Sequence, residues 1–245
     1  PRQGYASETG FDLSVPYYWN IAPNRDMTLT PRLMTERGLL LGVEYRFLEH
    51  WHQGQLEFEY LPDDRRYGGA RGSFNVTDRA APLPDAYTDL RYEYVSDDSY
   101  IRDLSNSLGF LTPNYLERHL DARYYGDWWQ ALARVQGFQI LNPAIFSLTG
   151  NPYQRLPQLL FDGAWPTGAG GFSYQLHGEI VNFQQSDVVT GIRLDLWPTV
   201  GWTLEQPWGY VKPQAGFRYT SYQLDNTAPG AGDAPSRSLP VLSLD

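Results

Sequence analysis

The chain has 245 residues, a net charge of −9 at pH 7, 15% aromatic residues and only 19% charged residues. Its 19 Lys and Arg residues leave no basic field for a phosphate backbone, so we expect no nucleic-acid partner. The absence of cysteine excludes disulfide frameworks, thiolate metal sites and cysteine nucleophiles within this sequence. No apolar stretch approaches the roughly 18 residues of a membrane helix, so any contact with a membrane would be made by strands.

The first predicted element, residues 15–24 with the sequence VPYYWNIAPN, places two prolines among aromatic residues that favour strands. Proline has no backbone N–H and cannot complete a ladder of hydrogen bonds, so it belongs at an edge, a strand end or a bulge. Pro16 and Pro31 are predicted to lie at such positions, whereas Pro23 is expected in the turn between two strands.

Further along the chain, apolar and polar residues alternate in segments of about ten residues, as in strands with two different faces. In the first of these segments Phe58 and Tyr60 alternate with Glu57 and Glu59, and Arg91 and Glu93 occupy the polar face of the second. The alternating segments lie, in chain order, at residues 55–60, 89–94, 119–124, 129–136, 174–180, 192–196 and 214–219. Turn residues separate them, so roughly a dozen strands in a single domain, residues 1–245, are predicted.

Two all-β architectures fit this pattern. In an antiparallel transmembrane β-barrel the apolar residues face lipid, aromatic residues gather near strand ends, and the polar residues line a wet interior. The alternative is a soluble, aromatic-rich β-sandwich that binds or hydrolyses polysaccharide, with Trp128, Trp129 and Trp202 as stacking platforms. The polar positions hold acids, Arg and Gln, and Lys is nearly absent, which favours the barrel.

Residues 11–38, FDLSVPYYWNIAPNRDMTLTPRLMTERG, resemble the opening of the barrel of the LptD family, the lipopolysaccharide-assembly proteins also called Imp or organic-solvent-tolerance proteins. EYRFL at 44–48 and EFEYLPDD at 57–64 extend the resemblance, and residues 92–104 and 137–141 match more loosely. The resemblance implies that this chain is the N-terminal portion of an outer-membrane β-barrel. The periplasmic jelly-roll domain and the C-terminal barrel strands of the family would then lie outside it.

The resemblance also implies a function and its residues. A member of this family would insert lipopolysaccharide into the outer leaflet of the Gram-negative outer membrane through a lateral gate between the first and last strands. Pro16 and Pro31 match the prolines that weaken this gate, and the stretch Tyr17, Tyr18, Trp19 and Asn20 would lie beside it. The aromatic residues of this stretch also fit a simple interfacial girdle.

The implied partners are lipopolysaccharide, outer-membrane lipid, the lipoprotein LptE as a plug, the barrel-assembly machinery, and the periplasmic bridge protein LptA, which would bind the N-terminal domain. Glu57, Glu59, Arg91 and Glu93 are expected to face the lumen, where they would line a hydrated path or meet the plug.

No catalytic signature is present. Glu57 and Glu59 lie two residues apart on one face, a spacing that could serve glycoside hydrolysis but is more typical of solvated acids. His50 and His52 could chelate a metal, but no third ligand accompanies them. We therefore expect no enzyme activity, no cofactor and no metal.

Overall fold

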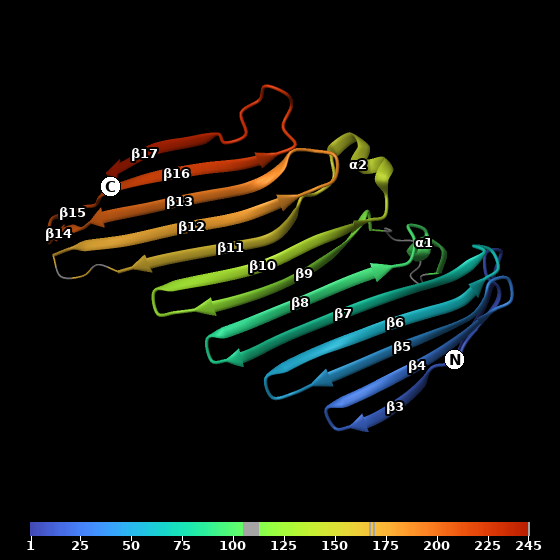
Figure 1. Cartoon of the computed structure of the whole chain (residues 1–245). Coiled ribbons are helices and arrows are strands. Elements are labelled where there is room, and N and C mark those ends of the chain that lie inside the picture. Colours follow the sequence, from blue (N-terminus) through green and yellow to red (C-terminus); the bar gives the residue numbers. More distant parts are fainter. Residues whose placement is uncertain (105–112, 167, 169, 245) are drawn as a thin grey trace. The chain divides into compact units, whose positions relative to one another are not determined.

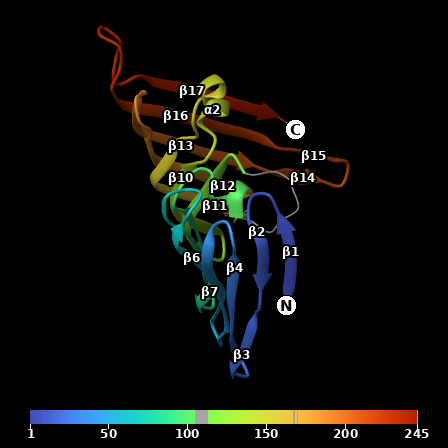
Figure 2. The same cartoon turned by 90° about the vertical axis from the view of Figure 1, so that its right-hand side faces the viewer.

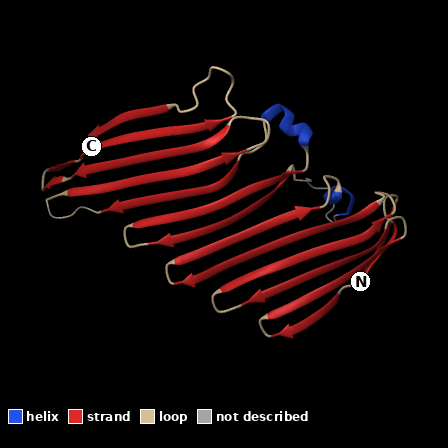
Figure 3. Ribbon diagram, in the orientation of Figure 1, coloured by secondary structure: helices blue, strands red, loops and turns tan. Residues whose placement is uncertain are grey.

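A computed structural model describes residues 1–104, 113–166, 168 and 170–244. In these residues the chain forms seventeen strands and two short helices, coloured in chain order in Figure 1 and by type in Figure 3. The elements are β1 (Arg2–Ala6), β2 (Gly10–Ser14), β3 (Tyr17–Ala22), β4 (Arg25–Met34), β5 (Gly38–Leu48), β6 (His52–Asp64), β7 (Gly69–Leu83), β8 (Ala86–Val95), α1 (Tyr100–Leu104), β9 (Tyr115–Tyr125), β10 (Trp129–Ile140), α2 (Pro143–Thr149), β11 (Gln154–Trp165), β12 (Phe172–Gln184), β13 (Thr190–Trp202), β14 (Leu204–Gln206), β15 (Gly209–Val211), β16 (Pro213–Asp225) and β17 (Ser236–Leu244).

The chain divides into two compact units. Unit 1 comprises Pro1–Pro82, Thr88–His119 and Phe138–Asn151, and unit 2 comprises Leu83–Tyr87, Leu120–Gly137 and Pro152–Asp245. The hydrogen-bonded strands of unit 1 follow the order β1-β2-β4-β5-β6-β7-β8-β9, with β3 also paired to β4. Those of unit 2 follow β9-β10-β11-β12-β13-β16-β17, and β14 and β15 form a separate hairpin.

The all-β prediction is confirmed. Nearly all strands that pair in each sheet are also consecutive in sequence. The sequence explains this order, because consecutive alternating segments joined by short turns pair as antiparallel hairpins. The strands outnumber the predicted dozen because the β1-β2 and β14-β15 hairpins are short pieces that period-two patterning does not reveal. No helix in the described part of the chain combines the length and apolar character needed to cross a membrane.

The two faces of the sheet in unit 1 differ as the alternation predicts. On β6, Phe58 and Tyr60 are about 40% exposed, whereas Glu57 and Glu59, which alternate with them, are half-buried. The pairing places Phe58 opposite Val43 of β5, and Glu57 opposite another acid, so each face keeps its character from strand to strand. Apolar side chains are therefore on the open face, and polar side chains are on the more enclosed one.

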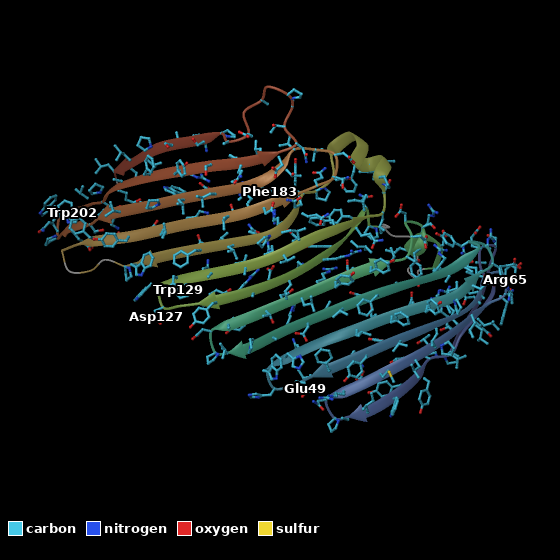
Figure 4. The ribbon with its side chains drawn as sticks, viewed as in Figure 1. Glu49, Arg65, Asp127, Trp129, Phe183 and Trp202 are labelled. Carbon is cyan, nitrogen blue, oxygen red and sulfur yellow. The ribbon has the colours of Figure 1, made fainter. Side chains whose placement is uncertain are left out.

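The buried core of unit 1 lies at one end of its strands. Glu49 and Arg65 mark the two ends of β6 in Figure 4, and the core lies toward the Arg65 end. Its members come from β4, β5, β6, β8, α1 and β9 and from the residue after β10: Met34, Leu40, Leu61, Val95, Tyr100, Leu104, Leu116 and Leu141. Helix α1 contributes two of them, so it packs against the strands at this end.

Candidate functional site

Strands β2 and β3 of unit 1 lie end to end along β4, separated by Val15 and Pro16. β2 and β3 both pair with β4, and Figure 2 shows β3 continuing beyond β2 along it. Ser14 pairs with Arg32 and Tyr17 with Leu29, so each strand advances by three residues and the register is unchanged across Pro16. The proline therefore interrupts a single strand without a bulge.

Pro31 removes one backbone hydrogen bond from this line. The Val15 N–H donates to the Pro31 carbonyl oxygen at 3.2 Å, and the register places these two residues opposite each other. Opposed residues of this kind in an antiparallel pair normally exchange two N–H···O bonds. Because Pro31 has no N–H, the return bond to the Val15 carbonyl is missing.

Pro16 removes a donor from the other edge. Backbone groups of successive strand residues point to opposite sides, so Pro16 directs its nitrogen away from β4 when Val15 directs its own toward β4. In the described residues β3 pairs with β4 alone, and its outer edge is open. A further strand that joined this edge would find no donor at Pro16.

The residues after Pro16 alternate between the two faces. Tyr17 and Trp19 lie opposite apolar residues of β4, on the open apolar face. Tyr18 and Asn20 lie on the polar face, where the Tyr18 hydroxyl is 3.4 Å from Asp26 Oδ2. Sequence reasoning placed all four beside the seam but did not separate them by face.

The four residues expected in the lumen all have polar partners. Glu57 accepts hydrogen bonds from Gln55 (2.6 Å) and Asn75 (3.0 Å). Glu59 accepts one from the Tyr100 hydroxyl (2.8 Å). Each of these contacts lies on the polar face of β6, so both carboxylates on this face are hydrogen-bonded.

Arg91 and Glu93 pair with each other at 2.6 Å. Arg91 also lines a cavity of about 580 Å³ with Gln55, which puts β6 and β8 on the same polar side. His119 bonds Asp89 at 3.0 Å in the same cavity. On the polar face of unit 1, Arg91 and Glu93 therefore form an ion pair, whereas Glu57 and Glu59 are hydrogen-bonded to neutral side chains.

His52, one of the two histidines considered as metal ligands, has a partner on the next strand. His52 Nδ1 lies 3.0 Å from Asp78 Oδ2, so this ring has a carboxylate partner on the neighbouring strand. Within the described residues no three His, Cys, Asp or Glu side chains come together as metal ligands.

Sequence reasoning missed a buried ionic cluster at the Arg65 end. Arg71 is fully buried and contacts Asp64 (3.0 Å), Asp97 (2.7 Å) and Asp103 (3.1 Å). Arg37 also binds Asp64, at 2.7 Å. The residues are spread over 67 positions of sequence in turns and strand ends, where no periodic pattern signals contact, and only the acid-rich SDDS stretch after β8 hinted at it.

The cluster shifts the ionisation of its members outside the strands. Burial opposes ionisation of Asp97, but hydrogen bonds from Arg71, Ser99 and Ser96 outweigh it and lower the pKa of Asp97 to about 2. Burial and the nearby Glu59 carboxylate raise the pKa of Tyr100 well above its usual range. Both groups therefore keep one protonation state at neutral pH.

All three tryptophans suggested as sugar platforms lie in unit 2, and Figure 4 labels Trp129 and Trp202, whose rings have local partners. Trp129 stacks on Tyr124 and Phe161 with ring centroids 5.2 and 5.6 Å apart. The Trp202 indole N–H donates to the Gly170 carbonyl at 3.0 Å. Trp128 is half exposed and lines a separate cavity.

Comparison with known proteins now identifies the family. The family model described as LptD, LPS transport system D, matches residues 64–245. The curated LPS-assembly protein LptD of Nitrosococcus oceani is 40% identical over 247 residues, which cover 100% of this chain and 33% of that protein. Those of Aromatoleum aromaticum and of an Azoarcus species are 38% identical, again over 100% of the chain and 31% of each relative.

The chain thus spans about a third of the length of these relatives. Residues 11–38, which carried the resemblance, precede the family-model match and are covered by the relatives. The soluble polysaccharide-binding sandwich is not supported, because the matching proteins are LPS-assembly proteins and the apolar side of the sheet in unit 1 is exposed. The chain belongs to the LptD family of LPS-assembly proteins.

Proposed function

We propose that this chain forms part of the wall of an outer-membrane β-barrel that inserts lipopolysaccharide into the outer leaflet. Two properties of unit 1 support the wall: exposed apolar side chains on one face and hydrogen-bonded charges on the other. A barrel in lipid needs this division, because its outer surface meets hydrocarbon and its lumen meets water. The chain's place in the LptD family supports lipopolysaccharide as the cargo.

The observation that carries a gate is the half-made pair between Val15 and Pro31. Each missing backbone bond removes roughly 0.5–1.5 kcal/mol of net stabilisation. Pro16 withholds a second donor from the strand that would close the barrel on the outer edge of β3. The seam between the first and last strands is therefore the place where the wall opens sideways.

A lateral opening suits this cargo for a physical reason. Acyl chains belong in the bilayer and sugars belong in water, so lipopolysaccharide has to sit across a slit that joins lumen and membrane. Tyr17 and Trp19 lie on the lipid side of that slit, and Tyr18 and Asn20 lie on the lumen side. The first pair anchors the strand at the interface, as aromatic residues do at membrane surfaces.

The partners follow from the same proposal. Glu57, Glu59, Arg91 and Glu93 line the lumen and meet either a hydrated sugar path or the LptE plug. LptA delivers cargo to an N-terminal periplasmic domain, and the barrel-assembly machinery folds the wall. We assign no catalytic step to this chain.

Replacing both gate prolines tests the proposal. The double variant Pro16→Ala with Pro31→Ala, made in the full-length protein, restores two donors and tightens the seam. Surface-exposed lipopolysaccharide, measured by labelling intact cells, should fall, while the amount of folded protein should stay the same. Pro62→Ala, at an exposed proline of β6 away from the seam, is the matched control. If the double variant has unchanged surface lipopolysaccharide, the two prolines do not act as a gate.

A further inference from the structure

The residue after Pro31 joins three elements on the polar face. The Arg32 guanidinium donates from Nε and Nη2 to the two carboxylate oxygens of Asp12 on β2, at 3.0 and 2.6 Å. Its Nη1 donates to the Leu104 carbonyl oxygen of α1 at 2.7 Å. Arg32 is 6% exposed, so this fork is enclosed by protein. A planar guanidinium is suited to such a fixed, multiple contact.

Helix α1 is itself firmly held. The Tyr100 hydroxyl donates to Glu59 of β6, and Asp103 pairs with Arg71 of β7. Tyr100 and Leu104 are both more than 95% buried in the core of unit 1. The bond from Arg32 therefore ties the start of the chain to a fixed point and not to a loose loop.

The strand beyond Pro16 has no comparable anchor. β1 pairs with β2 as far as Ser14 and with no residue of β3. The first five residues of β3 are exposed, and Tyr18 makes the long contact to Asp26 already described. At the junction the Val15 carbonyl lacks the bond that Pro31 cannot donate, and Pro16 has no N–H of its own. The segment Gly10–Ser14, before the junction, is thus anchored by a buried side chain, whereas Tyr17–Ala22, after the junction, is held mainly by its backbone bonds to β4.

We propose that Arg32 is a positioning residue of the seam, which fixes the clamped half, Gly10–Ser14, and leaves the free half, Tyr17–Ala22, to swing about the Val15–Pro16 junction. The side-chain clamp replaces the backbone bond that Pro31 removes, but only on the β2 side of the junction. The inference rests on the proposed function, because it names the part of the first strand that moves when the gate opens. It adds a second requirement to the gate: part of the strand has to stay in place.

Hydrogen exchange in the full-length protein in micelles tests the clamp without any transport. Replacing Arg32 with Met should speed exchange of the amides in Gly10–Ser14 about tenfold, toward the rate in Tyr17–Ala22. Arg134→Met, which breaks the similar Arg134–Asp121 pair of unit 2 (2.6 Å), is the matched control and should leave Gly10–Ser14 unchanged. An unchanged rate in the Arg32 variant would show that pairing with β1 alone holds the strand, and would overturn the clamp.

A charge exchange separates the clamp from general damage. Asp12→Arg combined with Arg32→Asp restores the ion pair between β2 and β4 but cannot donate to Leu104. Slow exchange in Gly10–Ser14 should return, while α1 exchanges faster than in the unaltered protein. If slow exchange does not return, the effect of Arg32→Met is a folding defect and the proposal fails. Asp12→Asn, which keeps Arg32, provides the weaker variant if the Met variant does not fold.

Two disulfides test which half moves. Tyr18→Cys with Thr28→Cys locks the free half to β4, at a directly opposed pair whose expected Cα separation of about 4.5 Å permits a disulfide. Leu13→Cys with Leu33→Cys locks the clamped half, at a hydrogen-bonded pair whose expected Cα separation of about 5.5 Å also permits a disulfide. The first lock should lower surface lipopolysaccharide severalfold until a reductant is added, and the second should not.

The outcomes distinguish the inference from the function beneath it. The proposal that Tyr17–Ala22 is the moving half would be overturned if both locks had equal effects. It would also be overturned if the first lock had no effect in cells whose surface lipopolysaccharide depends on this protein. If depletion of the protein leaves surface lipopolysaccharide unchanged, the proposed function fails. The exchange experiments still decide whether Arg32 clamps Gly10–Ser14.

Discussion

Removing the cation at the centre of the buried cluster should destabilise unit 1 more than any single surface change. In Arg71→Met a side chain of similar length replaces a guanidinium that is fully buried. The variant leaves Asp97 and Asp103 without this partner, and Asp64 keeps only Arg37 as its cation. The ring of Tyr67 also loses a guanidinium 4.6 Å from its centroid.

The size of the effect follows from desolvation. Breaking a buried ion pair by removing one partner costs about 3–5 kcal/mol, because the remaining charge stays out of water without compensation. The loss of the cation–π contact adds about 0.5–1 kcal/mol. Arg37 still neutralises Asp64, and Asp103 can turn toward solvent, so the lower end, about 3 kcal/mol, is the expected loss.

Urea unfolding of the full-length protein in micelles, followed by tryptophan fluorescence, measures the loss. Arg79→Met is the matched control: its side chain is 77% exposed and pairs with Asp89 at 3.0 Å. An exposed pair of this kind contributes about 0.2–1 kcal/mol. If the Arg71 variant loses no more free energy of unfolding than the control, the buried cluster does not stabilise the fold.

Three further outcomes are expected. Because the pKa of Asp97 is lowered to about 2, its stabilising contribution is complete above about pH 4 and is lost as the pH falls toward 2, so acid unfolding in that window should flatten in an Asp97→Asn variant. Gly38 has a φ of +139°, and a Cβ there would lie 2.7 Å from a backbone oxygen, so Gly38→Ala should lower the free energy of unfolding in urea by about 1–3 kcal/mol. In the control Gly4→Ala the added Cβ meets nothing within 4 Å, so the free energy of unfolding should not change. Phe58→Arg puts a charge on the apolar face and should cost about 2–4 kcal/mol in bilayers if it lies near mid-membrane, whereas Glu57→Arg on the polar face should cost less; equal costs would contradict the assignment of faces.

Period-two alternation was enough to predict which side chains share a face. It separates Phe58 and Tyr60 from Glu57 and Glu59 correctly, because the side-chain period of a strand is a local property of the backbone. It also predicts hairpins, since short turns leave consecutive strands no other partner. The gate role proposed for Pro16 and Pro31 came from the resemblance, and the hydrogen bonds that each proline cannot make came only from the register.

Contacts between distant residues were beyond the sequence. Arg71 reaches Asp97 and Asp103 across 26 and 32 positions, and Arg32 reaches Leu104 across 72. Such pairs depend on where α1 packs, and a five-residue helix has no periodic signal of its own. Tyr18 shows a smaller limit: in a run of three aromatic residues alternation gives no contrast, so its face could not be read.

A gate that opens within a membrane has to be weak in one place and strong beside it. If the whole first strand were loosely bonded, opening would expose a long row of unpaired backbone groups to lipid, at several kcal/mol for each group. In the proposed gate, Pro16 and Pro31 confine the missing bonds to one junction, and the ion pair of Arg32 with Asp12 on the polar face compensates for the backbone bond that Pro31 cannot make. In the proposed barrel this compensation lies on the polar face, where protein encloses the ionic bond between Arg32 and Asp12 and no charge is placed in hydrocarbon. The position of this arginine, one residue after the proline, therefore matters as much as its charge: in the proposed barrel, the same side chain moved by one residue would point into the membrane.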